Sequence, residues 1–228
     1  MKWFKKRFWQ WPDGLIWRIT WKPTLISRGK KFSLFMSIMK PKREDKILDV
    51  GIAPYSFRGT NFLEQWYPYP ENITALTNDK PERFKNFHQY FPKVILIFGD
   101  GKNLNFSDNY FDIVFSNAVV EHVGGVEEQK RFIHEIVRVG KRAFITTPNY
   151  WFPMDAHTLI PFAHWLPQRI KFWIYRKLER GYWADVNHLN LLTAKKFLSF
   201  FPKSVRVKIY KQRLLGITSS LIAVVEKN

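Results

Sequence analysis

Short apolar runs recur from residue 46 to the end of the chain, and each ends at glycine, proline or polar residues. Seven of them have the length and the Val, Ile and Phe content of β-strands. They cover residues 46–52, 73–77, 94–98, 111–116, 142–146, 205–210 and 220–225. Continuous apolar runs are typical of strands buried on both faces of a sheet. The run 205–210 alternates instead, so we expect that strand to be half exposed.

Helical segments fit between these strands, over residues 59–66, 82–90 and 126–139. The last is the clearest, because its apolar residues share one face and Gly140 follows as a stop signal. Alternating strands and helices predict an α/β fold whose crossovers place helices on both faces of a mostly parallel sheet. Only residues 211–217 separate the last two strands. We therefore expect a Rossmann-like seven-stranded sheet with a final antiparallel hairpin.

Charge divides the chain into three parts. Residues 1–45 hold 12 Lys and Arg against 3 Asp and Glu, and residues 157–228 hold 13 against 3. Residues 46–156 are nearly neutral, so the net charge of +18 comes from the flanks. We expect a basic, aromatic-rich arm over residues 1–45 and one domain over residues 46–228. Cysteine is absent, which excludes disulfides and thiolate chemistry.

Glycines and polar side chains follow several of the expected strands. Asp49 and Gly51 follow the first, Asn78 the second, Asp100 the third and Asn117 the fourth. In an open α/β sheet, ligands bind beyond the carboxyl ends of the strands. The sequence therefore predicts one ligand site at this end of the sheet.

Four sequence blocks in this pattern resemble those of a known protein family. In order they are ILDVG, ITALTND, FGDGKNLNFSDNYFDIVFSNAVVEHV and KRAFITTPN. They resemble the class I S-adenosylmethionine (SAM)-dependent methyltransferases of the type 11 kind, over roughly residues 45–228. The resemblance implies SAM as cofactor, S-adenosylhomocysteine as product, and methylation of an oxygen or nitrogen. It implies a small-molecule, lipid-linked or glycan-type acceptor, with residues 150–185 as an insertion on the acceptor side.

The resemblance also assigns contacts with the cofactor. The residues concerned are Asp49, Gly51, Ala53, Thr77, Asn78, Asp79, Asp100, Gly101 and Asn117. Those after the first strand would lie under the methionine part, and those after the second would reach the ribose. Asp100 would accept a hydrogen bond from the adenine amino group, and Asn117 would line the side where the methyl group is transferred.

Two segments depart from the family pattern. The family has further glycines two and four residues after Gly51, where this chain has Ala53 and Tyr55. Only glycine takes a positive φ without cost, so this loop runs differently or holds SAM less closely. Thr77 stands where the family has an acid, whose contact with the ribose would pass to Asn78 or Asp79.

Two histidines are candidates for catalysis. His122 follows the fourth strand near the expected methyl group, and His157 lies in the loop after the fifth strand. Either would serve as a general base if the acceptor must lose a proton, and either can equally be a packing residue. Related quinone O-methyltransferases bind a metal with an acid three residues before the Glu121-His122 pair. This chain has Ala118 there, so we expect no metal.

Cations and aromatic residues are interleaved in residues 2–11 and 165–177. This composition suits an anionic membrane surface, nucleic acid, or an arm whose rings pack on the domain. Tryptophan is abundant and no RNA-binding motif is visible, so membrane contact ranks above nucleic acid. With no expected secretory signal or spanning segment, we expect a cytoplasmic protein, peripheral on the inner membrane face. A non-catalytic scaffold and an RNA methyltransferase are the alternatives.

Overall fold

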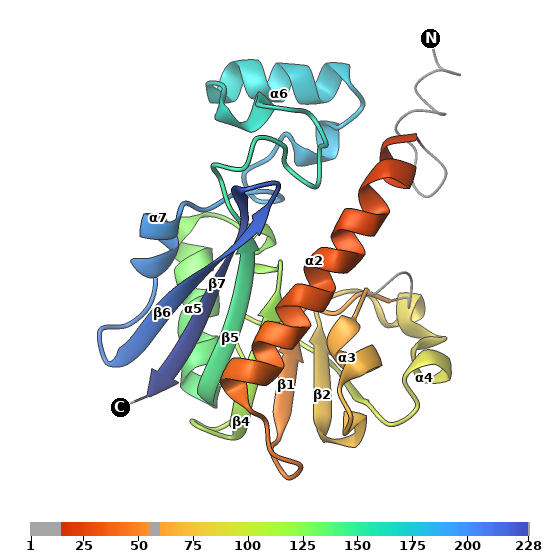
Figure 1. Cartoon of the computed structure of the whole chain (residues 1–228), viewed down its shortest axis with the longest axis vertical. Helices are drawn as coiled ribbons and strands as arrows, with labels where there is room; N and C mark the ends of the chain where they lie inside the picture. The colour runs from red at the N-terminus through yellow and green to blue at the C-terminus, as the bar shows by residue number, and fades with distance from the viewer. Residues whose placement is uncertain (1–14, 55–59, 228) are drawn as a thin grey trace.

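A single seven-stranded sheet organises the computed structural model, which describes residues 15–54 and 60–227 and side chains from residue 22 onward (Figure 1). The strand order is β3-β2-β1-β4-β5-β7-β6. The strands are β1 (Ile47–Val50), β2 (Ile73–Thr77), β3 (Ile95–Phe98), β4 (Phe111–Asn117), β5 (Gly140–Pro148), β6 (Val205–Leu214) and β7 (Ile217–Lys227). β7 runs antiparallel to both of its neighbours, β5 and β6, and the other pairs are parallel. The expected fold class is confirmed.

The final hairpin is tighter than the sequence predicts. β6 and β7 extend until only Leu215 and Gly216 separate them, instead of the expected loop over 211–217. Both residues have positive φ, of 50° and 81°. Two consecutive residues with positive φ are characteristic of a type I′ turn, whose twist matches that of the paired strands.

The first edge of the sheet also differs from expectation. The run at β3 is apolar throughout, yet Ile95 is 55% exposed and Phe98 is 45% exposed. β3 pairs only with β2, so one of its edges and part of its faces remain open. The alternating run in β6, at the other edge, is half exposed as expected.

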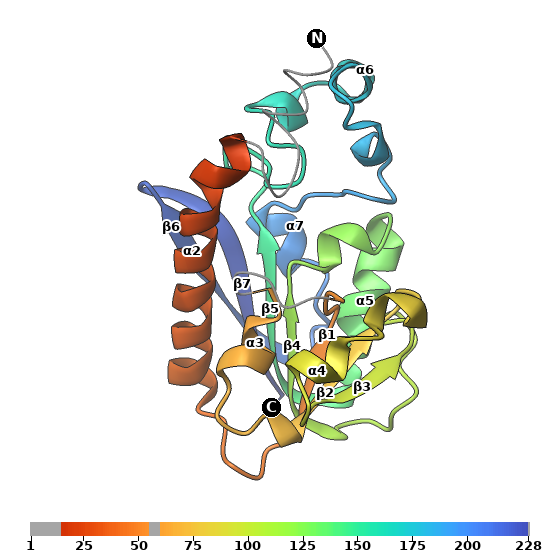
Figure 2. The ribbon, with the colours of Figure 1, turned by 90° about the vertical axis from the view of Figure 1, so that its right-hand side faces the viewer.

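Helices cover both faces of the sheet (Figure 2). α5 (Val126–Val139) and α7 (Ala194–Leu198) pack on one face, and α5 has the predicted bounds. α2 (Leu15–Met39), α3 (Phe62–Trp66) and α4 (Phe87–Tyr90) pack on the other. The helix expected over 82–90 is broken into a 3-10 turn, Pro81–Phe84, followed by α4. The one expected over 59–66 begins only at Phe62, because Asn61 before it is left-handed.

The second half of α2 belongs to the core. Phe35 is fully buried and Met39 is 2% exposed. The ring of Phe35 meets Phe115 of β4 and Phe144 of β5 edge-on, at centroid distances of 5.3 and 5.5 Å. The basic, aromatic segment over residues 2–11 lies outside the described residues. The second half of α2, which the sequence assigns to the arm, is therefore part of the helical layer on one face of the sheet.

Residues 150–190, which we call the cap, extend beyond the carboxyl ends of the strands (Figure 1). The cap contains α6 (Gln168–Lys177) and the 3-10 turns η4 (Ala163–Trp165) and η5 (Gly181–Trp183). Tyr175 of α6, 1% exposed, forms a small separate core with Ala163 and Ala184. Across residues 15–54 and 60–227, no helix has both the length and the apolar character needed to cross a bilayer.

Replacing Phe35 with Ala tests whether α2 is part of the core. We expect the free energy of unfolding to fall by about 3–5 kcal/mol, because a buried ring is lost and a cavity remains. Ile26→Ala on the same helix is the control, since Ile26 is 57% exposed and should change stability by less than about 0.5 kcal/mol. Urea denaturation followed by circular dichroism measures both, and equal effects would contradict the assignment.

Candidate functional site

A cavity of about 410 Å³ opens at the carboxyl ends of β1 and β2, beside the loops that follow β3 and β4. It is lined by Val50, Gly51, Leu76, Thr77, Asn78, Asp100, Gly101, Lys102, Val119, His122, Val123, Gly124, Glu128, Phe132, Asn187 and His188. A more open hollow of about 530 Å³ lies between α2 and β6, away from these strand ends. The first cavity is the one at the position where open α/β sheets bind ligands.

Two glycines allow the backbone to approach this cavity closely. Gly51 has φ +97°, and a Cβ on it would lie 2.3 Å from a methyl carbon of Val119. A Cβ on Gly101 would lie 2.7 Å from the ring of Phe132 and 2.9 Å from Val50. Both positions therefore require glycine for packing reasons that the sequence pattern alone does not reveal.

Five of the nine residues expected to contact the cofactor line the cavity, namely Gly51, Thr77, Asn78, Asp100 and Gly101. The other four lie around it. Asp79 forms an ion pair with Arg83. The backbone of Ala53 exchanges two hydrogen bonds with the side chain of Asn61. That pairing fixes the start of the loop at the position where the family has a further glycine.

Asp49 is buried beneath the cavity beside a second acid, Glu64 of α3. Their exposed fractions are 6% and 4%. Burial, reinforced by the neighbouring carboxyl of Glu64, raises the pKa of Asp49 well above its ordinary value, and burial also raises the pKa of Glu64. Within the described ranges, neither oxygen of Glu64 has a hydrogen-bond partner of ordinary geometry. The pair therefore retains a proton at pH values where separate carboxyls are ionised.

Asn117, at the end of β4, lies on the side of the site that faces α2. Its Oδ1 accepts hydrogen bonds from Lys31 Nζ (3.1 Å) and from Thr146 Oγ1 (2.8 Å). Burial lowers the pKa of Lys31 to about 8, although the negative charge of Glu121 opposes this shift. Helix α2 thus brings a cation to the strand ends.

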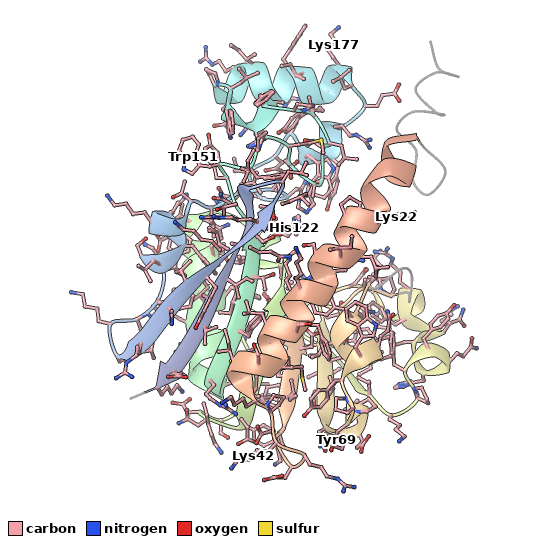
Figure 3. All side chains as sticks on the ribbon, in the orientation of Figure 1. Lys22, Lys42, Tyr69, His122, Trp151 and Lys177 are labelled. Carbon is pink, nitrogen blue, oxygen red and sulfur yellow. The ribbon has the colours of Figure 1, made fainter. Side chains whose placement is uncertain are left out.

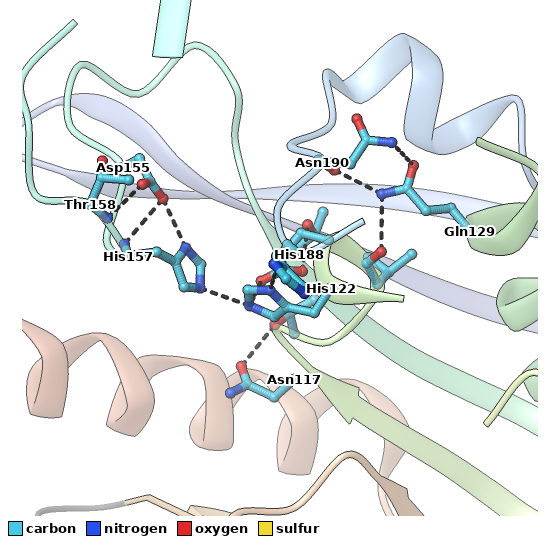
Figure 4. A network of polar contacts seen from close by, with 12 residues as sticks. Asn117, His122, Gln129, Asp155, His157, Thr158, His188 and Asn190 are labelled. Atoms are coloured by element: carbon cyan, nitrogen blue, oxygen red, sulfur yellow. Dashed lines mark hydrogen bonds and ion pairs between the residues drawn. The ribbon is translucent and has the colours of Figure 1, made fainter. Parts of the chain in front are cut away.

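The structure brings the two candidate histidines together (Figure 4). His122 Nε2 and His157 Nε2 are 2.8 Å apart. His122 Nδ1 lies 2.7 Å from the backbone oxygen of His188, and His157 Nδ1 lies 2.8 Å from Asp155 Oδ1. His122, labelled in Figure 3, lines the cavity, whereas His157 belongs to the cap, so the pair connects the two.

The environments of the two imidazoles shift their pKa values in opposite directions. Burial lowers the pKa of His122, with a further contribution from the nearby charge of His157. Burial also opposes protonation of His157, but the hydrogen bond and charge of Asp155 outweigh it and raise the pKa of His157. Of the two imidazoles, His157 is therefore the one that is protonated more readily. The indole of Trp183 covers both rings at 5.6 and 5.0 Å.

A buried amide network holds the turn that carries His122. Gln129 Nε2 donates to the backbone oxygens of Val120 and Asn190, and Asn190 Nδ2 donates to Gln129 Oε1. The backbone N–H of Asn190 donates to the backbone oxygen of Glu121 at 2.8 Å. Turn η3 (Val120–His122) is thereby fixed between α5 and the cap.

Residues 57–143 match a family described as a methyltransferase domain. This match contains the cavity-lining loops after β2, β3 and β4. This part of the chain is therefore similar to methyltransferase domains, in agreement with the resemblance that the sequence blocks indicate. Two uncharacterised proteins of Mycobacterium tuberculosis strains share 29% identity with it over 101 residues, 40% of this chain. That match spans only about a third (33%) of their length.

Solved structures share the fold of this chain at low identity. The PH0226 protein of Pyrococcus horikoshii is 15% identical, with a TM-score of 0.58 over 89% of this chain and 91% of its own. A SAM-dependent methyltransferase of Methanosarcina mazei is 14% identical, with a TM-score of 0.51 over 82% and 94%.

Several residues around the candidate site carry no local signal in the sequence. Lys31 sits among other cations of α2, and Trp183 belongs to a cap whose path the sequence does not specify. His188 has no partner pattern in the sequence, yet its backbone oxygen orients His122. Glu64 does carry a signal, because a lone acid between apolar residues in a short helix is costly to bury.

The Asp49–Glu64 pair predicts that stability depends on pH. Both pKa values are raised in the folded state, so the folded protein binds more protons than the unfolded chain. Stability should therefore fall as the pH rises above the ordinary values of 3.8 and 4.5 and towards the raised ones. Glu64→Gln should reduce this loss, making the variant more stable than wild type at pH 8 by about 1–3 kcal/mol.

Urea denaturation at several pH values between 4 and 8 measures this dependence. Glu71→Gln is the matched control, because Glu71 is exposed and the substitution removes the same charge. A wild-type stability that does not change over this range, or an equal response of both variants, would contradict the shared proton.

Proposed function

We propose that this protein transfers the methyl group of SAM to an oxygen or nitrogen of a small, lipid-linked or glycan-type acceptor. The observation that carries this proposal is the continuity between the strand-end cavity and the histidine pair. His122 lines the cavity and also contacts His157 under the cap. One end of the site is thus suited to a nucleotide-like cofactor, and the other presents polar groups for an acceptor.

The cavity residues suit SAM in three ways. The volume of about 410 Å³ is within the range of pockets for ligands of this size. Gly51 and Gly101 line the cavity without side chains that would fill it, and Asp100 offers an acidic acceptor of hydrogen bonds there. The buried pair of Asp49 and Glu64 supplies negative charge near a cofactor that carries a sulfonium and an ammonium group.

Bound SAM supplies an electrophilic methyl group, so the protein chiefly has to align the acceptor with it. We propose that His122 and His157 contact the acceptor and handle its proton. Asp155 fixes the orientation of His157 through the 2.8 Å hydrogen bond, and the backbone oxygen of His188 fixes His122. Trp183 covers both imidazoles and limits the access of water from the cap side.

Replacing Asp100 with Ala should weaken the binding of SAM and S-adenosylhomocysteine by about ten- to hundredfold. A hydrogen bond to a charged group contributes about 1.5–3 kcal/mol. Isothermal titration calorimetry measures both ligands. Glu127→Ala is the control, because that carboxyl is 81% exposed on α5. An unchanged affinity would reject the assignment of Asp100 to the adenine.

The activity itself is tested with methyl-labelled SAM and an extract that contains small molecules and lipids. Mass spectrometry should find the label in a product that forms with the wild type and decreases strongly with Asp100→Ala. Tight binding of S-adenosylhomocysteine without any labelled product would favour the non-catalytic scaffold instead.

The outer face of α6 supports contact with an anionic membrane. Trp173 is 60% exposed and Ile170 is 49% exposed, with exposed Arg169, Arg176 and Lys177 on the same helix face. Figure 3 shows Lys177 on the side of the cap farthest from the sheet. Interleaved aromatic and basic residues on one helical face are characteristic of interfacial binding. We propose that this face rests on a membrane and brings the cap to lipid-linked acceptors.

Removing the charge of Arg176 and Lys177 together, by alanine substitution, should weaken binding to phosphatidylglycerol-containing vesicles by about tenfold or more. Each cation near such a surface contributes about 1 kcal/mol. The matched control is Arg206→Ala with Lys208→Ala, which removes two exposed charges from β6. Vesicle flotation measures the bound fraction, and pure phosphatidylcholine vesicles give the background. Tight binding to bulk RNA without binding to vesicles would overturn the membrane proposal.

A further inference from the structure

Three side chains at the acceptor end of the site converge on one point. Glu121, His122 and His157 each offer one ligand atom, and the three atoms lie within 4.8 Å of one another. Two of the residues come from the turn after β4, and the third comes from the cap. The question is what occupies the space between them.

The hydrogen bonds of the two imidazoles fix their protonation. A backbone oxygen only accepts hydrogen bonds, so His122 Nδ1 must donate its proton to His188. The carboxylate of Asp155, held by the backbone amides of His157 and Thr158, likewise accepts from His157 Nδ1. In their neutral forms, both histidines therefore present a lone pair at Nε2.

Those two lone pairs face each other at 2.8 Å. Two acceptors at this distance repel unless a cation lies between them, and the cation is either a proton or a metal ion. His157 in its protonated form satisfies the first possibility. A metal ion satisfies the second once the two nitrogens move slightly apart and both lone pairs point to it.

The third side chain distinguishes these possibilities. Glu121 is fully buried, and its Oε2 accepts a hydrogen bond from Thr147 Oγ1 at 3.0 Å. Its Oε1 lies 3.9 Å from His122 Nε2 and has no hydrogen-bond partner among residues 15–54 and 60–227. A shared proton leaves this buried oxygen unsatisfied, which is costly. A metal ion satisfies it.

We propose that Glu121, His122 and His157 bind a divalent transition-metal ion of the zinc class. Imidazole nitrogens favour such ions over Mg²⁺ or Ca²⁺. Two nitrogens bound at about 2.1 Å lie about 3.0 Å apart in octahedral and 3.4 Å apart in tetrahedral geometry, so the pair has to open by only a few tenths of an ångström. Asp155, His188 and Thr147 already orient the three ligands, as second partners of metal ligands commonly do.

This metal site differs from the one that the sequence analysis expects to be absent. The expectation of no metal concerned ligands from a single segment, in which Ala118 replaces an acid. The fold supplies the third ligand from the cap instead, 35 residues away in the chain. The proposal rests on the proposed function only for the role of the ion. With the ion bound, the two imidazoles are ligands, and the ion instead of the histidine pair would promote loss of the acceptor's proton. Because His122 lines the cavity, remaining coordination positions would face an acceptor oxygen or nitrogen.

Metal binding is measured on the whole protein after treatment with a chelator and dialysis. We expect calorimetry to show one Zn²⁺ bound per chain, and Co²⁺ to give visible absorption bands that saturate at one equivalent. Glu121→Gln and His157→Gln should each weaken the binding by at least about 100-fold. Asp155→Asn, which removes only the partner of His157, should weaken it by about 10–100-fold.

His134→Gln is the matched control, because His134 is exposed on α5 and outside the cluster. Thermal denaturation checks that each variant is folded. If a variant of one of the three ligands does not fold, Asp155→Asn still tests the proposal. Failure to bind one equivalent, or equal weakening in the control, would overturn the metal site and leave the shared proton. Binding of S-adenosylhomocysteine to the metal-free protein, measured separately, tests the cofactor site on its own.

Discussion

The parallel pairing of β4 between β1 and β5 is the constraint on which the site depends. It aligns the carboxyl ends of the central strands, so that Gly51, Asn117 and the turn carrying His122 emerge at one edge. Strands that are buried on both faces cannot shift register without exposing apolar side chains. The positions of the cavity and of the turn carrying His122 are therefore set by the core, whereas the cap positions His157.

Sequence periodicity was sufficient to predict this core, because each central strand is a continuous apolar run and α5 has a clear apolar face. It failed at β3, where the same kind of run forms an edge strand with Ile95 exposed. The hydrophobic content of a segment indicates that it prefers a β-sheet, but the number of strands beside it depends on the strand order. It also failed at the final turn, where backbone conformation rather than composition decides where β6 ends.

The site was predictable in part, for the residues that directly follow strands. Gly51, Asn78, Asp100 and His122 could be placed because the ends of parallel strands meet at one edge. Glu64 and Lys31 come from helices that pack over that edge, and their proximity to Asp49 and Asn117 depends on tertiary packing. His157 was a candidate by type, but only the path of the cap brings it within 2.8 Å of His122.

Helix α2 makes the N-terminal region inseparable from the rest of the molecule. Phe35 fills the core beneath β4 and β5, and Lys31, one turn earlier, reaches Asn117 at the strand ends. A single rigid helix thus carries both a packing residue and a charge of the site. The helix cannot be exchanged between proteins as an independent module. Any change that displaces it alters the stability of the domain and the electrostatic field at the acceptor at the same time.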